Sequence, residues 1–406
     1  MKMAPYRQVL AQPGLKLLML VGMLARIPVT AAAMTVTLHV VNTLGLNFAR
    51  AGLAGALAML GVGIGSPLLG RMVDKVGLRP VLIVATVVQG IYWLTAPHLS
   101  YTALVVAAFF AGLLSIPIFS VMRQFMAAMV PIEHRRPAFA LDSMGVELSY
   151  MVGPALAVAL VTSLGSQFTM TAVGTGLVLG GTALIVMNPP IRSAEEEESQ
   201  TVTLPRREWL RPSLIALLAA TAAATFVLTA TELSIVAALR HTGATKWIGL
   251  IIVAWSLYSL IGGFIYGGLR RSISPLLIIA GMAALTIPLG LVSGWWWLLL
   301  AVIPCGLLCA PSIAATVDAV SHLVPAGARG EAMGLHGTAL TCGIAIGAPT
   351  GGWVIDTFGP AWGFTAAGLA GLLVVAAVFP FWQRSPATSA AAVEPELATV
   401  GANTNG

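Results

Sequence analysis

Apolar stretches of about 20 residues or more follow one another along almost the whole chain, separated by short polar segments. Each stretch is long enough to cross the ~30 Å hydrocarbon core of a bilayer as a helix. Lipid offers no partner for backbone polar groups, so a segment that satisfies them internally is expected to be helical. The pattern therefore predicts twelve membrane-spanning helices, near residues 15–41, 48–70, 80–97, 101–127, 138–163, 168–189, 212–239, 247–267, 275–292, 297–322, 332–356 and 360–383.

A polar stretch from Arg192 to Arg211 divides the twelve expected helices into two sets of six. Beyond the last expected helix the chain is rich in Ala, Thr and Glu, a composition typical of disorder. The pattern thus predicts an all-α membrane protein made of an N-terminal six-helix bundle (residues 1–190), a linker (191–211), a C-terminal six-helix bundle (212–384) and a disordered tail (385–406).

The composition excludes several classes of protein. Hydrophobic residues make up 58% of the chain and charged residues only 9%, whereas soluble globular proteins carry about 25% charged residues. The formal net charge of +6 is too small to suggest nucleic-acid binding. Cys305, Cys309 and Cys342 lie in apolar stretches, as expected of small buried side chains rather than a metal or redox site. No nucleotide loop, metal-spaced cluster or nucleophile pattern is found, so we expect neither an enzyme nor a cofactor.

The basic residues are distributed unevenly between the two sides of the expected bundle. With the N-terminus in the cytoplasm, all but five of the 21 Lys and Arg residues fall on the cytoplasmic side. Arg50, Arg240 and Lys246 fall outside, and Arg26 and Arg123 lie within spans. Because cytoplasmic loops are enriched in Lys and Arg, we expect a multi-pass protein of the cell membrane with both termini, the linker and the tail in the cytoplasm.

The two halves of the sequence repeat each other. Gly112-Leu113-Leu114 with Pro117 is matched, 194 residues later, by Gly306-Leu307-Leu308 with Pro311. Single matches in Gly- and Leu-rich sequence arise by chance, but several occur here in one order and register. They favour a duplicated six-helix unit, an arrangement found in transporters whose binding site lies between the halves near mid-membrane.

The loop between the second and third expected helices carries the most specific motif, Gly70-Arg71-Met72-Val73-Asp74-Lys75-Val76-Gly77-Leu78-Arg79. Its glycines permit close helix approach and a tight turn, and Asp74 can bind basic groups or a helix N-terminus. The loop resembles the signature of the major facilitator superfamily, except that Leu78 stands where the family usually has Arg. The resemblance implies two pseudo-symmetric bundles and a latch that holds the cytoplasmic side while the carrier opens outward, formed by Gly70, Asp74, Lys75, Gly77 and Arg79.

A second motif bears on the direction of transport. Gly153-Pro154 in the fifth expected helix resembles the signature of the family's drug–proton antiporters, which favours export. The copy is incomplete, because the positions where that signature has Gly hold Ser149, Ala157 and Val158. The eleventh expected helix has a corresponding small-residue stretch that is better explained by close helix packing, formed by Gly347, Pro349, Gly351 and Gly352.

Ionisable groups near the bilayer centre cost at least about 2.5 kcal/mol on insertion scales and are functional candidates. Arg26, Glu147 and Glu232 are the candidates for substrate binding or proton coupling, with a structural ion pair as the alternative. A second set of charged residues is expected to form gating pairs near the cytoplasmic side: Arg123, Asp142 and Asp318. Arg123 and Asp142 are about equally far from the turn near residue 132, so the two helices joined there should bring them level. The histidines within or near spans are expected to be structural: His39, His322 and His336.

Together these features predict a secondary transporter that works by alternating access, most simply a proton-coupled exporter of an amphipathic drug or metabolite. The alternative is a proton-coupled importer or facilitator of a sugar or other nutrient. We expect a small-molecule substrate, protons as the coupling ion, contact with lipid and a monomer. Glu147 is the favoured proton carrier if Arg26 lies apart from it, and Glu232 if the two pair.

Overall fold

The computed structural model describes residues 4–12, 14–191, 206–269 and 273–383. Most of the expected linker and the expected disordered tail (385–406) lie outside these residues. The first expected bundle is formed by α1 (Ala4–Leu10), α2 (Leu15–Asn42), α3 (Phe48–Val76), α4 (Leu78–Thr95), α5 (Tyr101–Leu113), α6 (Ile118–Met129), α7 (Arg135–Leu164) and α8 (Ser166–Met187).

After the short α10 (Arg206–Trp209), the second expected bundle is formed by α11 (Pro212–His241), α12 (Ile248–Gly267), α13 (Pro275–Thr286), α14 (Trp295–Ala301), α15 (Ile303–Gly306), α16 (Cys309–Leu323), α17 (Arg329–Phe358) and α18 (Pro360–Gln383). In the described part of the chain, eleven helices are long and apolar enough to cross a membrane. The ninth expected span is a shorter apolar helix over Pro275–Leu291. The prediction of an all-α membrane protein is confirmed.

Two of the expected spans are broken, where the sequence pattern predicted continuous helices. The fourth span stops at Leu113 and resumes at Ile118, because Pro117 has no backbone N–H and disfavours helical geometry in the residue before it. The tenth span is interrupted between Ala301 and Cys309, around a proline at the start of α15. In both halves the helix ends within the repeated Gly-Leu-Leu sequence, so the two halves share an irregularity as well as a helix order.

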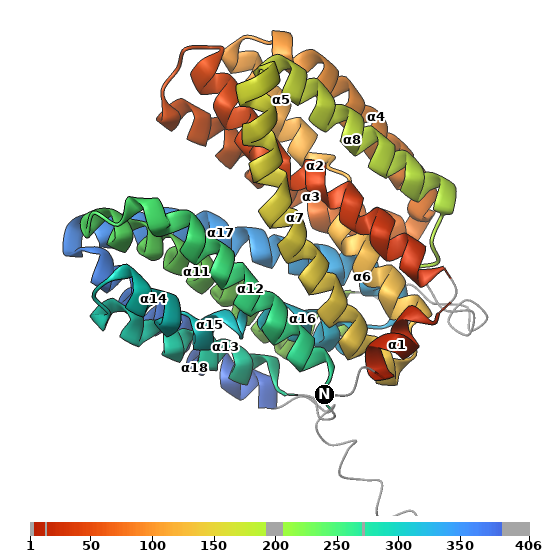
Figure 1. Ribbon diagram of the computed structural model, residues 1–406. Coiled ribbons are helices and arrows are strands. Elements are labelled where there is room, and N and C mark those ends of the chain that lie inside the picture. Colours follow the sequence, from red (N-terminus) through yellow and green to blue (C-terminus); the bar gives the residue numbers. More distant parts are fainter. Residues whose placement is uncertain (1–3, 13, 192–205, 270–272, 384–406) are drawn as a thin grey trace, which may run out of the picture.

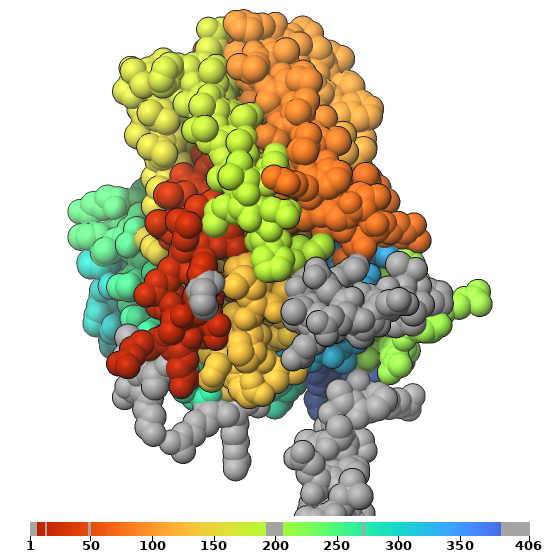
Figure 2. Space-filling model, turned by 90° about the vertical axis from the view of Figure 1, so that its right-hand side faces the viewer, coloured from red at the N-terminus to blue at the C-terminus, as the bar shows by residue number. Residues whose placement is uncertain are grey.

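The helices form two groups, α1–α8 and α11–α18 (Figure 1). In the first group α8 packs on α2 and α4 and lies on one outer face (Figure 2). The groups contact each other through α3 with α17, α7 with α12 and α16, and α6 with α17. Figure 1 shows them meeting near α1, α6 and α16 and diverging toward the opposite end. We call the end where they meet, which holds α1, the end of α3 and the starts of α7 and α17, the closed end.

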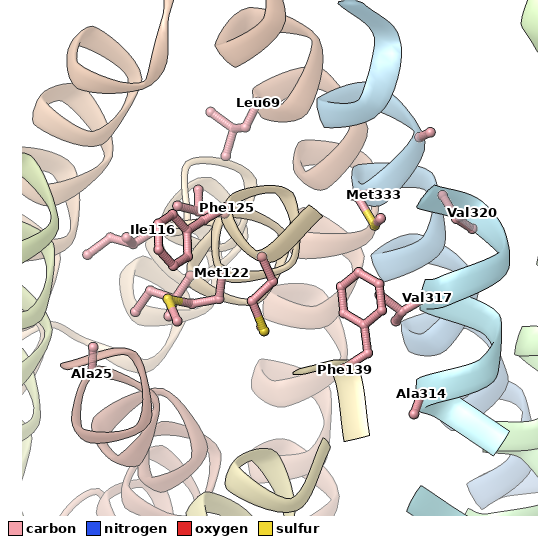
Figure 3. Close-up of a cluster of buried hydrophobic side chains, with 14 of the residues drawn as sticks. Ala25, Leu69, Ile116, Met122, Phe125, Phe139, Ala314, Val317, Val320 and Met333 are labelled. Carbon is pink, nitrogen blue, oxygen red and sulfur yellow. The ribbon is translucent and has the colours of Figure 1, made fainter. Parts of the chain in front are cut away.

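Apolar side chains fill the contact between the groups at the closed end. Phe139 of α7 points toward Val317 of α16, with Met333 of α17 beside it (Figure 3). All three are at most 2% exposed. On the side of the first group, Phe125 and Met122 of α6 continue the same buried cluster. This layer excludes water from the space between the two groups at this end.

Candidate functional site

The loop after α3 binds the start of α17 in the other group. The Asp74 carboxylate accepts hydrogen bonds from the backbone N–H groups of Gly330 (2.9 Å) and Glu331 (2.8 Å). These N–H groups lie in the first turn of α17, where no helical carbonyl is available to them and the helix dipole favours a negative charge. Gly70 lies against the Gly330 backbone, where a Cβ would overlap the carbonyl. Asp74 and Gly70 therefore join α3 to α17 through backbone atoms.

Glu331 ties further segments to the same point. It is almost fully buried and forms ion pairs with Arg71 of α3 (3.8 Å) and with Arg206 of α10. The Arg79 side chain instead bonds the Ile185 carbonyl within the first group (3.2 Å), and Lys75 is exposed. Gly77 adopts φ 89°, a conformation that favours glycine and lets α4 begin one residue after the turn. Of the expected latch residues, Asp74 and Gly70 reach the second group and Arg79 does not.

Short polar side chains add hydrogen bonds to backbone carbonyls across the groups. Ser66 of α3 donates to Gly334 (3.1 Å), and Thr338 of α17 donates back to Gly63 (2.7 Å). Ser120 of α6 lies 3.4 Å from the Met333 carbonyl. Each partner carbonyl lies on a helix that approaches closely, so the contact depends on backbone proximity more than on large side chains.

A buried charge network connects the two groups farther from the closed end. Asp142 of α7 pairs with Arg26 of α2 (2.6 Å) and with Arg123 of α6 (3.7 Å). Arg123 reaches His336 of α17 (3.0 Å between Nη1 and Nδ1), and His336 Nε2 lies 2.9 Å from the Thr316 hydroxyl of α16. All these side chains are at most 4% exposed. Arg26 also stacks over the Phe119 ring at 5.1 Å.

The structure separates two pairings that the sequence left open. Arg26 binds Asp142 and not Glu147. Asp318 pairs with His322 one turn along its own helix (3.4 Å) and does not join Arg123 and Asp142. The expected gating set is thus divided: Arg123 and Asp142 lie together with Arg26, while Asp318 lies apart from them.

Glu147 lies half-buried near the middle of α7, at the contact with α12. Its carboxylate accepts a hydrogen bond from the Ser259 hydroxyl (2.8 Å), which itself accepts from the Ala310 backbone N–H (3.1 Å). Glu232 of α11 is exposed. Glu147 therefore lies at the contact between the groups, where its hydrogen bond from Ser259 joins them.

The small-residue motifs lie at helix crossings inside each group. Gly153 packs against Thr30 and Ile27 of α2. Gly347 and Gly351 of α17 pack in the same way on α11, Gly352 lies near Leu233 of that helix, and Pro154 and Pro349 lie within α7 and α17. The glycines thus allow close packing of α2 with α7 and of α11 with α17.

A comparison of the sequence with known protein families agrees with these features. They are the two helix groups, the apolar helices and the acidic loop bound to the start of a helix in the opposite group. The sequence model of the Major Facilitator Superfamily matches residues 18–275 and 213–402. The chain belongs to this superfamily. Its members are transporters and not enzymes, so the chain is a membrane-embedded transporter of small molecules. No protein of curated function matches it.

Solved structures share the fold at low sequence identity. A bacterial homologue of the iron transporter ferroportin in the outward-facing state superposes with a TM-score of 0.73 at 15% identity, over 92% of this chain and 100% of that one. The proton:xylose symporter XylE gives 0.70 at 14% identity, over 91% and 96%. The human organic anion transporter MFSD10 gives 0.69 at 16% identity, over 90% and 100%. At such identities these transporters are similar in fold alone.

Sequence reasoning missed several residues that contact the predicted ones. Ser259, which bonds Glu147, and Arg206, which bonds Glu331, have no local signal, because each partner lies more than 100 residues away. His336 was expected to be structural. It lies 213 residues from Arg123 in the sequence, so only the placement of the two groups against each other reveals their contact.

Proposed function

We propose that this transporter is a proton-coupled exporter of an amphipathic drug or metabolite, working as a monomer in the cell membrane with the closed end facing the cytoplasm. The proposal is carried by Glu147, a half-buried carboxylate of one group that is bonded to Ser259 of the other. A proton that neutralises such a carboxylate alters a contact between the groups, which is what coupling to alternating access requires.

The physical argument rests on the strength of the bond that Glu147 accepts. A hydrogen bond to an ionised carboxylate is roughly twice as strong as one between neutral groups. Protonation of Glu147 weakens the bond from Ser259 and removes a charge that is otherwise held between the two groups. Since Arg26 is bound to Asp142, no basic side chain of the described network holds Glu147 ionised, and Glu147 is favoured over Glu232 as the proton carrier.

The surroundings of Glu147 support the proposed substrate. Trp255 lies one turn before Ser259 on the same face of α12, and Ser259 bonds Glu147. An amphipathic molecule with a positive charge would find an aromatic surface and a carboxylate there. The orientation is supported by the basic residues, which gather on the side of the closed end, and export by the Gly153-Pro154 motif.

The test uses proteoliposomes with an imposed pH gradient and ethidium, an amphipathic cation, as the probe. Wild-type protein should accumulate ethidium against its gradient, and Glu147→Gln should abolish accumulation while retaining some downhill exchange. Glu133→Gln serves as the control, because Glu133 is an exposed carboxylate at the closed end. If both Glu147→Gln and Glu232→Gln keep full gradient-driven transport, proton coupling through these residues is wrong. In cells, deletion of an exporter raises ethidium accumulation, whereas deletion of an importer lowers it.

A further inference from the structure

We propose that His336 is a positioning residue for transport: it must be neutral for the closed end to stay closed, and a proton on it favours separation of the two groups there. This role rests on the alternating-access transport proposed above but not on its substrate or on Glu147. His336 is fully buried and is bonded on one side to the first group, through Arg123, and on the other to its own group, through Thr316.

The hydrogen-bond partners fix which nitrogen of His336 carries the proton. The Arg123 guanidinium has only N–H donors, so Nδ1 of His336, 3.0 Å away, must be the acceptor. Thr316 donates its own hydroxyl hydrogen to the Ile313 carbonyl (2.8 Å). Its oxygen is therefore the acceptor for Nε2–H of His336 (2.9 Å). Both ring nitrogens are satisfied only in the neutral Nε2–H form.

A second proton would have to bind Nδ1, where Arg123 already points an N–H. Two donors would then face each other, and two positive charges would lie about 3 Å apart away from water. His336 keeps its bond to Thr316, which belongs to the same group, and Arg123 keeps Asp142, which belongs to its own. The contact that is lost is the one between the groups, so protonation drives them apart rather than unfolding either.

Among the residues that the structure describes, no further charged group contacts His336 to offset this repulsion. From α3 the residues level with it are Gly63 and Ser66, which are uncharged. From α11 the neighbours of the next turns of α17 are Ala222 and Thr225. On α16, Asp318 pairs with His322, and α18 carries no charged residue over Pro360–Gln383. Asp142 reaches His336 only through Arg123, and its other partner is Arg26.

Other titratable groups join the two helix groups at the closed end, and the experiment must separate them from His336. Asp74 binds α17, and Glu331 pairs with Arg71 and Arg206. Tyr6 of α1 donates to the Phe264 carbonyl of α12. Burial raises the pKa of Tyr6 to about 12, so it stays a neutral donor throughout the pH range in which histidines titrate. A variant that changes His336 alone leaves all these groups in place.

The experiment measures the separation of the two groups at the closed end by the distance between two spin labels in lipid nanodiscs. The labels are placed at Glu133→Cys and Arg211→Cys, which are exposed positions in the first and second group. The background carries Cys342→Ser, which removes the exposed native cysteine, and Glu147→Gln, which removes the carboxylate of the proposed coupling site. Distances are compared from about pH 8 to about pH 5, the range in which histidines titrate.

We expect the ratio of closed to separated molecules to fall as the pH is lowered, by up to about tenfold per pH unit while one group titrates. His336→Gln, whose amide can both accept from Arg123 and donate to Thr316 but cannot gain a proton, should abolish this response. His39→Gln should retain it, because His39 is an equally buried histidine that bonds Ser166 within the first group.

The proposal is overturned if the background protein shows no pH response, if His336→Gln keeps it, or if His39→Gln loses it as well. Should His336→Gln not be recovered as folded protein, His336→Asn provides the same pairing groups on a shorter side chain. Because the measurement reads distances and not transport, it can fail while gradient-driven export by the intact protein succeeds, and the reverse also holds.

Discussion

Replacement of Asp74 by Asn should shift the transporter toward the state in which the closed end is separated. The carboxylate accepts two backbone N–H bonds from α17, at 2.9 and 2.8 Å, and hydrogen bonds to a charged group contribute about 1.5–3 kcal/mol each. Asn keeps one accepting oxygen, so one bond is lost, together with about 0.5 kcal/mol of attraction to the helix dipole. Because Asp74 is partly exposed, we take about 2 kcal/mol, which corresponds to a change of about 30-fold in the equilibrium between the two states.

A buried cysteine between the groups can report this change. Ala140 of α7 is fully buried against Gly267 of α12, so Ala140→Cys should react with a maleimide only when the groups separate. In a Cys342→Ser background, Asp74→Asn should raise the labelling rate about 30-fold, since the rate follows the separated population. Asp356→Asn is the matched control, because this exposed carboxylate lies at the far end of α17, the helix whose start Asp74 binds. A rate for Asp74→Asn within about threefold of the control would refute the reasoning.

Two further predictions separate contacts between the groups from contacts within them. Gly70→Ala and Gly153→Ala both place a Cβ on a neighbouring helix. Gly70→Ala should raise labelling at Ala140→Cys with little loss of thermal stability. Gly153→Ala acts within the first group and should lower the free energy of unfolding by about 1–3 kcal/mol. Equal effects of the two substitutions in both assays would contradict this. Arg26→Gln leaves the buried Asp142 with one weaker partner and should cost about 3 kcal/mol. Tryptophan fluorescence on heating checks it, and the double variant Arg26→Gln with Asp142→Asn should recover part of the loss; an Arg26→Gln protein as stable as the wild type would show that the pair contributes nothing.

The helix pattern could be predicted from the sequence because apolar length alone decides which segments suit a bilayer. The break in the fourth span could also have been predicted from Pro117, which has no backbone N–H. It is missed when spans are assigned by hydropathy, which does not register the missing N–H. The proximity of Arg123 and Asp142, 3.7 Å apart, follows from their equal distance to the turn between α6 and α7. Such arguments succeed where the geometry is local to one hairpin.

Contacts between distant helices could not be predicted in the same way. Arg26 is equally compatible by sequence with Glu147 and with Asp142, and only the rotation of α2 and α7 about their axes decides for Asp142. The contact of Arg123 with His336 depends on how the two groups meet, and so does the contact of Asp74 with the start of α17. Asp318 lies near the expected gate by sequence, yet it pairs along its own helix. The roles of Glu147, Glu232 and the latch remain predictions for the experiments above.

The hydrogen bonds from Ser66 and Thr338 to opposing carbonyls also bear on how fast the transporter can cycle. Ser and Thr have few rotamers, so re-forming these bonds orders little side-chain freedom, whereas a long Lys or Arg loses up to about 2 kcal/mol of conformational entropy. Their partners are backbone atoms of rigid helices that are already in place before contact. These bonds can therefore re-form without a slow search for side-chain conformations, unlike the pairs that Arg71 and Arg206 form with Glu331.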